Sequence, residues 1–291
     1  TNRSYLIGLI VPDLMHSYFA EVAKAVETIA RPAGYEILIC NTDEDPEKEV
    51  AEVTALQHRT DGLIISSAVA ANKASVYRRM INEGAKLVLC DRHFDRLHCP
   101  MVITDNVKVG EIATEHLINL GHRRIGHLRG ADVKVADDRL KGYQQALLKH
   151  KIRFDERLVR SHSFIESDGY EAMRAWIAEG NLPSAIFAVN DPVAFGAMSA
   201  LHEAGIKVPA EVAIIGAGNI HYGDMLRVPL TTVTWDRTMM GQKAAQMLIN
   251  MIEGTESRNG ASQKVILDPA VLVRESCGAQ KKNSVRLRRA K

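Results

Sequence analysis

Short apolar runs alternate with amphipathic segments along most of the chain. In residues 5–11 the apolar positions are almost continuous, which is typical of a strand buried on both faces. The next segment places Phe19, Val22, Val26 and Ile29 at spacings of three and four, which predicts one face of a helix. The chain therefore begins with a strand followed by a helix.

This alternation continues to the end of the chain. The expected strands are 5–11, 35–40, 62–66, 86–90, 101–104, 124–128, 158–161, 185–189, 212–215, 231–234, 265–267 and 271–273. The expected helices follow residue 19, open at Asp45-Pro46, and span about 72–82, 107–120, 137–150, 168–179, 192–204 and 240–251. Trp176 is expected on the buried side of its helix.

The repeated strand–helix unit predicts an α/β fold with mostly parallel sheets and helices on both faces. About a dozen strands are too many for one sheet of this size, so we expect two Rossmann-like lobes. The N-terminal lobe is expected at 4–120 plus about 236–262, and the C-terminal lobe at 121–235 plus about 263–277. No Gly/Ser-rich or proline-rich linker divides them, which favours several short crossovers that act as a hinge.

Charge is unevenly distributed along the chain. The net charge is +2, but six of the 37 basic residues lie in 278–291, a segment without acidic residues. The rest is net negative and does not predict a nucleic-acid-binding surface. The basic tail could contact phosphates of DNA or RNA, although a solvated, disordered end explains it better because it has no aromatic residue to stack on bases.

The cysteines and the apolar runs bear on the compartment. No apolar run reaches the roughly 18 residues of a membrane span, and the start shows no secretion signal. None of the four cysteines forms a C-x-x-C pair, so buried free thiols in a reducing cytoplasm are expected. The predicted location is therefore cytoplasmic, without contact to a membrane.

A series of short motifs gives the sequence a family resemblance. The chain resembles the effector-binding domain of the LacI/GalR family of repressors, which has the type I periplasmic-binding-protein fold. Each motif alone is weak, but their number and order are specific. The matching stretches are Ile7-Gly8-Leu9-Ile10-Val11-Pro12-Asp13, Cys40-Asn41-Thr42-Asp43, Asp61-Gly62-Leu63-Ile64, Cys90-Asp91-Arg92, Gly121-His122-Arg123-Arg124-Ile125, Asn190-Asp191, Ala194-Phe195-Gly196-Ala197, Pro229-Leu230-Thr231-Thr232-Val233, Met240-Gly241 and Leu272-Val273-Arg274-Glu275-Ser276-Cys277.

The resemblance implies both a function and a mechanism. Members of this family sense a small molecule in the cleft between two lobes, and closure around it changes the affinity for operator DNA. In this family an N-terminal helix-turn-helix module reads the DNA, and this chain does not contain that module. A homodimer is implied as well, because two such modules match a two-fold operator. No cofactor is implied, and the protein is not expected to be an enzyme.

The resemblance also assigns the ligand site, in which polar groups pair with sugar hydroxyls and rings stack on C–H faces. The candidates from the first turn are His16, Tyr18 and Phe19. Those that follow are Asp105, Arg139, Phe164, Asn190 and Trp235.

Each candidate also has a structural alternative. Phe19 and Phe164 could be core rings, and Trp235 could be packing at the hinge. Asp105 and Asn190 could cap the helices that follow them. Arg139 could form a surface ion pair with Asp137 or Asp138.

Two departures from the family pattern concern the ligand. In Gly216-Ala217-Gly218-Asn219, Gly218 stands where the family usually has an aspartate that binds ligand hydroxyls. Trp235 stands where the family has a polar residue, and His16 replaces an asparagine. The pocket loses a carboxylate and gains a ring. We therefore expect an effector with a larger apolar face than a free hexose, such as a glycoside, a disaccharide or a non-sugar metabolite.

Other patterns in the sequence do not predict a nucleotide site, a metal site or a catalytic site. Gly216-x-Gly218 lacks the third glycine of a dinucleotide site, since His221 stands there. A cluster of Cys90, His93, His98 and Cys99 lacks the spacing of a zinc site, so no metal is expected. No nucleophile elbow, P-loop or H-E-x-x-H is present. The main alternative function is a periplasmic sugar-binding protein of a transporter, which shares the fold but requires secretion.

Overall fold

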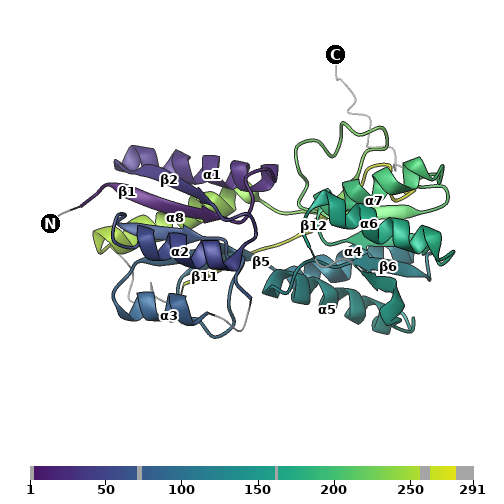
Figure 1. Cartoon of the computed structure of the whole chain (residues 1–291), viewed down its shortest axis with the longest axis horizontal. Coiled ribbons are helices and arrows are strands. Elements are labelled where there is room, and N and C mark those ends of the chain that lie inside the picture. Colours follow the sequence, from purple (N-terminus) through teal and green to yellow (C-terminus); the bar gives the residue numbers. More distant parts are fainter. Residues whose placement is uncertain (1–2, 71–73, 161–162, 256–262, 280–291) are drawn as a thin grey trace, which may run out of the picture. The chain divides into compact units, whose positions relative to one another are not determined.

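A computed structural model describes residues 3–70, 74–160, 163–255 and 263–279 of the chain (Figure 1). Its strands are β1 (Leu6–Val11), β2 (Glu36–Asn41), β3 (Gly62–Ile65), β4 (Leu87–Asp91), β5 (Met101–Thr104), β6 (Ile125–Leu128), β7 (Val159–Arg160), β8 (Ala185–Ala188), β9 (Ala213–Ala217), β10 (Thr231–Thr234), β11 (Lys264–Leu267) and β12 (Ala270–Leu272). Its α-helices are α1 (Ser17–Ala30), α2 (Pro46–Leu56), α3 (Ser75–Asn82), α4 (Asn106–Asn119), α5 (Lys134–Lys149), α6 (Glu166–Ala178), α7 (Asp191–Glu203) and α8 (Arg237–Glu253).

The chain folds into two compact units. Unit 1 contains residues 1–109, 130–141 and 235–269, and unit 2 contains 110–129, 142–234 and 270–291. The chain therefore passes between the units several times, as the absence of a linker predicts. The α/β class with two mostly parallel sheets is confirmed.

The sheet of unit 1 has six parallel strands in the order β11-β5-β4-β3-β1-β2. Alternate side chains of its strands, such as Leu63 and Leu89, pack with Tyr77 and Met80 of α3 in one core. Because side chains alternate across a sheet, the intervening residues face the opposite side. There α1 and α8 pack against each other.

Unit 2 repeats the arrangement in the order β12-β10-β9-β8-β6-β7. All its strand pairs are parallel except β10 with β12. Helices α6 and α7 cross closely, because a Cβ added at Gly196 would lie 1.8 Å from the backbone oxygen of Glu166. Trp176 of α6 is fully buried, as its helical position predicts.

Both sheets have a point where the strand order reverses. In unit 1 the chain runs from β1 outward to β2 and then returns to β3 on the other side of β1. In unit 2 the same step leads from β6 to β7 and back to β8. Loops at the carboxyl ends of strands diverge at such a point and leave room for a ligand.

Two expectations about the lobes need correction. The sequence-based boundary places 263–277 in the second lobe, but β11 pairs in parallel with β5 in unit 1, with Lys264 opposite Met101. Only β12 joins the sheet of unit 2. The three-residue apolar run 265–267 shows that a strand forms but not which sheet edge it joins. The first passage between units also comes earlier than 120, between Val109 and Gly110 within α4.

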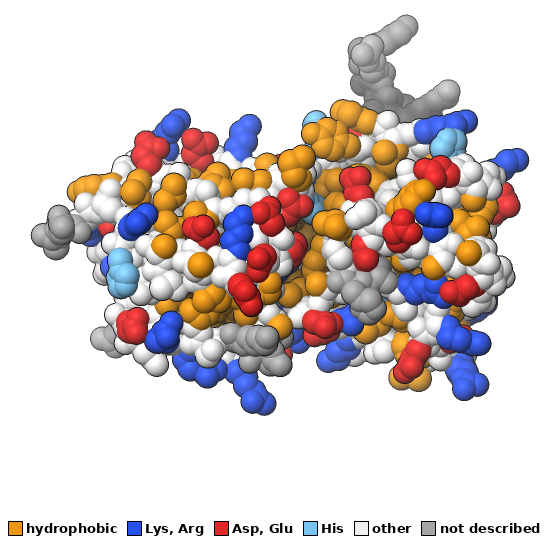
Figure 2. All heavy atoms as spheres, viewed as in Figure 1, with side chains coloured by type: hydrophobic (Ala, Val, Ile, Leu, Met, Phe, Trp, Pro, Cys, Tyr) orange, Lys and Arg blue, Asp and Glu red, His pale blue; other side chains and the backbone are white. Residues whose placement is uncertain are grey.

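The state of the cysteines and the distribution of surface charge can be compared with the expectations from the composition. All four cysteines are free, and Cys40 is half-buried whereas the other three are buried. Acidic and basic side chains are interspersed on the face drawn in Figure 2. Within the described residues no helix is both long and apolar enough to span a bilayer. The basic tail lies outside the described residues from position 280 onward.

Candidate functional site

A polar and aromatic cluster lies at the carboxyl ends of the strands in unit 1. Tyr18 follows β1 in the first turn of α1, Asp91 ends β4, and Trp235 follows β10 where the chain enters unit 1. Three separate parts of the sequence therefore meet at the edge of the sheet where ligands bind in parallel α/β folds.

The Tyr18 hydroxyl joins this cluster. It donates a hydrogen bond of 2.7 Å to Oδ1 of Asp91 and accepts one of 3.2 Å from Nε1 of Trp235. Tyr18, Asp91 and Trp235 are only 4%, 7% and 7% exposed. Because an unpaired polar group is costly at this depth, these bonds hold the three side chains in place.

Asp91 has an unusual backbone conformation. Its φ is +68°, and the N–H of Arg92 bonds to the carbonyl of Cys90 at 2.7 Å, which closes a three-residue turn around Asp91. A non-glycine residue in this region is strained, and such strain concentrates at functional sites. Burial raises the pKa of the Asp91 carboxyl, while the Tyr18 hydrogen bond and the charges of Arg92 and Arg139 oppose that rise.

The residue after Asp91 is tied to a neighbouring loop. The Arg92 guanidinium forms a two-pronged ion pair with Glu44, at 2.7 Å from Nη1 to Oε2 and 2.6 Å from Nη2 to Oε1. Nη1 also donates to the carbonyl of Ser67, which follows β3. Glu44 has a φ of +57°, so a second strained residue lies in this network. Arg92 therefore joins the loops after β2, β3 and β4.

A buried carboxylate supports the loop after β3. Glu49 of α2 is fully buried and accepts hydrogen bonds from the Ser67 and Tyr77 hydroxyls and from the N–H of Ala68. Burial raises the pKa of Glu49, and these three bonds counteract it. Two of the donors belong to the loop after β3 and the third to α3, so Glu49 holds this loop against α2 and α3.

His16 and Phe19 complete an aromatic group with Tyr18. The ring centroids lie 5.9 Å apart for His16 and Tyr18, 5.7 Å for His16 and Phe19, and 5.1 Å for Tyr18 and Phe19, all with edge-to-face geometry. His16 also caps α1, since its Nδ1 accepts the N–H of Tyr18. Phe19 is buried, which agrees with its core alternative without excluding contact with a ligand.

The imidazole of His16 is neutral at physiological pH. Burial, together with the positive charges of Arg92, Arg139 and Arg237, lowers the pKa of His16 to about 4. A neutral ring can accept a hydrogen bond at Nδ1, as the cap requires.

Arg139 reaches the cluster from α5. It is 4% exposed, its Nε donates to Oδ1 of Asn106 at 2.9 Å, and its guanidinium carbon lies 5.3 Å from the centre of the Trp235 ring. Asp138 binds Lys134 at 2.7 Å, one turn earlier in the helix. Because Arg139 is buried, it does not occupy the exposed surface position that its ion-pair alternative assumed.

Asp105, next to Asn106, caps α4. Its Oδ1 accepts the N–H of Lys108 at 3.0 Å, the helix-capping contact given as its alternative role. The side chain is half-buried in unit 1. Five of the other predicted residues also lie in unit 1, namely His16, Tyr18, Phe19, Arg139 and Trp235.

The two remaining candidates contact each other in unit 2. Oδ1 of Asn190 caps α7 by accepting the N–H of Val193 at 2.9 Å, and its Nδ2 donates to the carbonyl of Phe164 at 2.8 Å. Phe164 is 7% exposed. Asn190 follows β8, which borders the reversal point of this sheet.

Gly218 is required by its loop. Its φ is +123°, a conformation that residues with a side chain rarely adopt. Asp191 shapes the loop by accepting the N–H of Ile220 at 2.8 Å and the hydroxyl of Thr232 at 2.7 Å. The absence of a side chain at 218 thus agrees with the backbone conformation of this loop.

Comparison with known proteins identifies the family. Residues 114–277 match the periplasmic binding protein-like domain family. The chain is 32% identical over 94% of its length to the transcriptional regulator DegA of Bacillus subtilis, of which the match covers 81%. It is 33% identical over 87% of its length to the ribose operon repressor of Halalkalibacterium halodurans, with 74% of that protein covered. The chain belongs to the LacI family of transcriptional regulators.

Solved structures of LacI-family regulators have the same fold as this chain. The regulator CelR in complex with cellobiose superposes with a TM-score of 0.84 at 25% identity, covering 94% of this chain and 85% of that one. CcpA of Lactococcus lactis gives a TM-score of 0.83 at 26% identity, with coverage of 93% and 98%. These relatives are regulators rather than enzymes.

Sequence reasoning did not select Asp91, Arg92, Glu44 and Glu49 of this LacI-family chain as site residues. Asp91 and Arg92 occur in a matching motif, and a polar pair that ends an apolar strand is a usable signal. The roles of Glu44 and Glu49 depend on contacts between loops far apart in the sequence. No group of metal-binding side chains occurs within the described residues.

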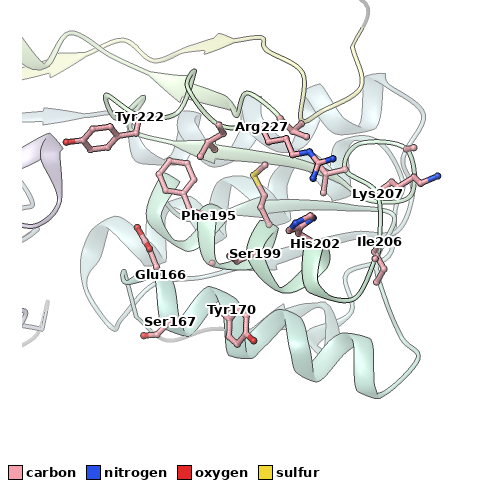
Figure 3. Close-up of a pocket in the computed structure, with 17 residues that line it drawn as sticks. Glu166, Ser167, Tyr170, Phe195, Ser199, His202, Ile206, Lys207, Tyr222 and Arg227 are labelled. Atoms are coloured by element: carbon pink, nitrogen blue, oxygen red, sulfur yellow. The ribbon is translucent and has the colours of Figure 1, made fainter.

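Unit 2 of this LacI-family chain also carries a large groove, with a volume of about 1300 Å³ (Figure 3). Its lining includes Phe195 of α7 and Tyr222 of the loop before β10. The Tyr222 side chain is 56% exposed. Figure 3 shows Glu166 at one end and Lys207 at the other. The groove is thus mainly apolar between ends of opposite charge.

Proposed function

We propose that this LacI-family chain senses a small polar effector, a sugar or sugar derivative. The observation that carries the proposal is the cluster of Asp91, Tyr18, Arg139 and Trp235 at the carboxyl edge of the sheet. A buried carboxylate and a guanidinium suit hydroxyl groups, and aromatic rings suit the C–H faces of a sugar. These groups are held in position by hydrogen bonds to one another and to Asn106, which reduces the entropic cost of binding.

The effector is proposed to contact unit 2 as well. Asn190 and Phe164 adjoin the reversal point of the second sheet, as Tyr18 adjoins that of the first. A ligand that binds both units favours the closed conformation by its differential affinity. This population shift would change the affinity for operator DNA, read by an N-terminal helix-turn-helix module that precedes this sequence.

The class of effector follows from the rings and from Gly218. Trp235 adds an aromatic surface, while Gly218 provides no carboxylate for a hydroxyl. A disaccharide or glycoside with a larger apolar face than a free hexose fits this combination. The structural relative CelR was solved with cellobiose, which makes cellobiose a reasonable first ligand.

A thermal-shift screen followed by calorimetry tests the ligand class. The panel contains glucose, ribose, cellobiose, maltose, an aryl β-glucoside and a purine base. Binding of a disaccharide or glycoside, with weak binding of free hexoses, supports the proposal. Tight binding of glucose would refute the larger apolar face, and binding of the purine alone would refute the sugar class.

The gene sequence upstream of Thr1 tests the link to DNA. A helix-turn-helix supports the regulator, whereas a signal peptide would favour a secreted sugar-binding protein.

We further propose that two copies pair through the groove of unit 2. A two-fold contact places the Glu166 end of one copy opposite the Lys207 end of the other, so the charges complement each other. The exposed Tyr222 supplies an apolar anchor at the rim. Pairing of this kind would present two DNA-reading modules to a two-fold operator.

A further inference from the structure

A chain of contacts runs from Asp91 to two places where the backbone passes between the units. Trp235 is the first residue after the passage that follows β10, and Asn106 lies three residues before the passage at Val109. Arg139 contacts both, through its bond to Asn106 and its position over the Trp235 ring. Tyr18 then joins Trp235 to Asp91.

The Tyr18 hydroxyl also lies 3.0 Å from Sδ of Met240, a weak acceptor, and its bonds to Asp91 and from Trp235 depend on each other. A hydroxyl that donates to a carboxylate is polarised, and its oxygen becomes a stronger acceptor. The bond from Tyr18 to Asp91 therefore strengthens the bond from Trp235 to Tyr18. At 4% exposure for Tyr18 and 7% for Trp235, no bulk water replaces a lost partner without rearrangement.

We propose that Tyr18 is a positioning residue that couples occupation of Asp91 to the backbone passage at Trp235. A ligand hydroxyl that bonds to Asp91 competes with Tyr18 for the carboxylate. The Tyr18 oxygen then becomes a weaker acceptor, and the indole N–H of Trp235 is released from its fixed position. The passage after β10 gains freedom to change its backbone dihedrals.

This inference deepens the proposed function and rests on it for the identity of the competing ligand. The proposed coupling depends only on bonds within the protein and can be tested without an effector. Trp176 and Trp235 are the only tryptophans of the chain, so Trp176→Phe leaves Trp235 as the sole indole fluorophore.

The test uses hydrogen–deuterium exchange of the peptide 231–240 and acrylamide quenching of Trp235 in the Trp176→Phe protein. Tyr18→Phe is expected to speed exchange in this peptide about tenfold, the factor for losing roughly one buried hydrogen bond. It should also increase quenching of Trp235. Tyr143→Phe is the matched control, because it removes another buried tyrosine hydroxyl, which donates to the Ile125 carbonyl in unit 2.

Further variants separate coupling from a general loss of stability. Asp91→Asn keeps an acceptor at Oδ1 and should preserve slow exchange at 231–240, whereas Asp91→Ala should not. In a Trp235→Phe background, Tyr18→Phe should add little, because the shared bond is already absent. The peptide covering β1 reports any general loosening.

Two results would overturn the proposal. One is unchanged exchange and quenching in Tyr18→Phe. The other is equal acceleration of 231–240 and β1, which indicates global destabilisation. Failure of every sugar to bind would instead contradict the proposed function and leave the coupling intact.

Discussion

At the scale of single residues, the polar side chains at strand ends also serve the helices that follow. His16, Asp105 and Asn190 each accept a backbone N–H in the first turn of the next helix. A cap uses one acceptor atom and fixes the direction of the side chain. Capping and ligand contact are therefore compatible at these positions.

His16 should make stability depend on pH. Its pKa is about 4 in the folded protein and about 6.5 in the unfolded chain, so only the unfolded chain takes up its proton between these values. Stability is therefore lost as pH falls below 6.5, by about 2 kcal/mol between pH 8 and pH 5.

Urea unfolding of the wild type and His16→Asn at both pH values measures this contribution. Asparagine keeps the cap but does not titrate. Equal pH dependence in the two proteins would contradict the assignment, since the other histidines are common to both.

Gly218 should not tolerate the aspartate that the family usually has there. Gly218→Asp and Gly218→Ala are both expected to destabilise the protein by about 1–3 kcal/mol, because a φ of +123° is unfavourable for any side chain. Asp224→Ala in the same loop is the control and should stay within about 0.5 kcal/mol. Denaturant unfolding checks the values, and a fully stable Gly218→Asp would show that the loop readjusts at no cost.

At the scale of elements, the period of the apolar pattern was enough to predict the strands and α-helices of the described residues, but not the short 3-10 helices Arg31–Ala33 and Glu156–Leu158. The pairing of β11 with β5 could not be predicted, because a short apolar strand suits either sheet. Asp91 was missed as a site residue for a related reason. Its hydrogen bond to Tyr18 spans 73 positions, and its positive φ is not visible in the sequence.

The crossing of α6 and α7 depends on small residues. Gly196→Ala would place a methyl group 1.8 Å from the Glu166 carbonyl oxygen, which belongs to the backbone and cannot rotate away. We expect a loss of about 1–3 kcal/mol or more in the free energy of unfolding. Ser199→Ala, at an exposed position of α7, is the control. Equal stability of the two variants in urea would mean that the helices are less tightly packed.

At the scale of the whole molecule, the account combines an effector site with pairing of two copies. Sedimentation equilibrium tests the pairing. Tyr222→Asp, in the groove, is expected to weaken dimerisation strongly, whereas Leu148→Asp, exposed on α5 outside the groove, should leave it intact. A monomeric wild type, or a Tyr222→Asp protein as dimeric as the wild type, would contradict pairing through this groove.

The central claim is that one effector is bound by the polar and aromatic residues of both units. A crystal structure of the chain with the tightest ligand from the screen tests it most directly. The account predicts that ligand hydroxyls bond to Asp91 and Arg139 and that a ring of the cluster contacts the ligand's apolar face, with Asn190 or Phe164 on its other side. A ligand bound elsewhere, or one that contacts only a single unit, would contradict the account.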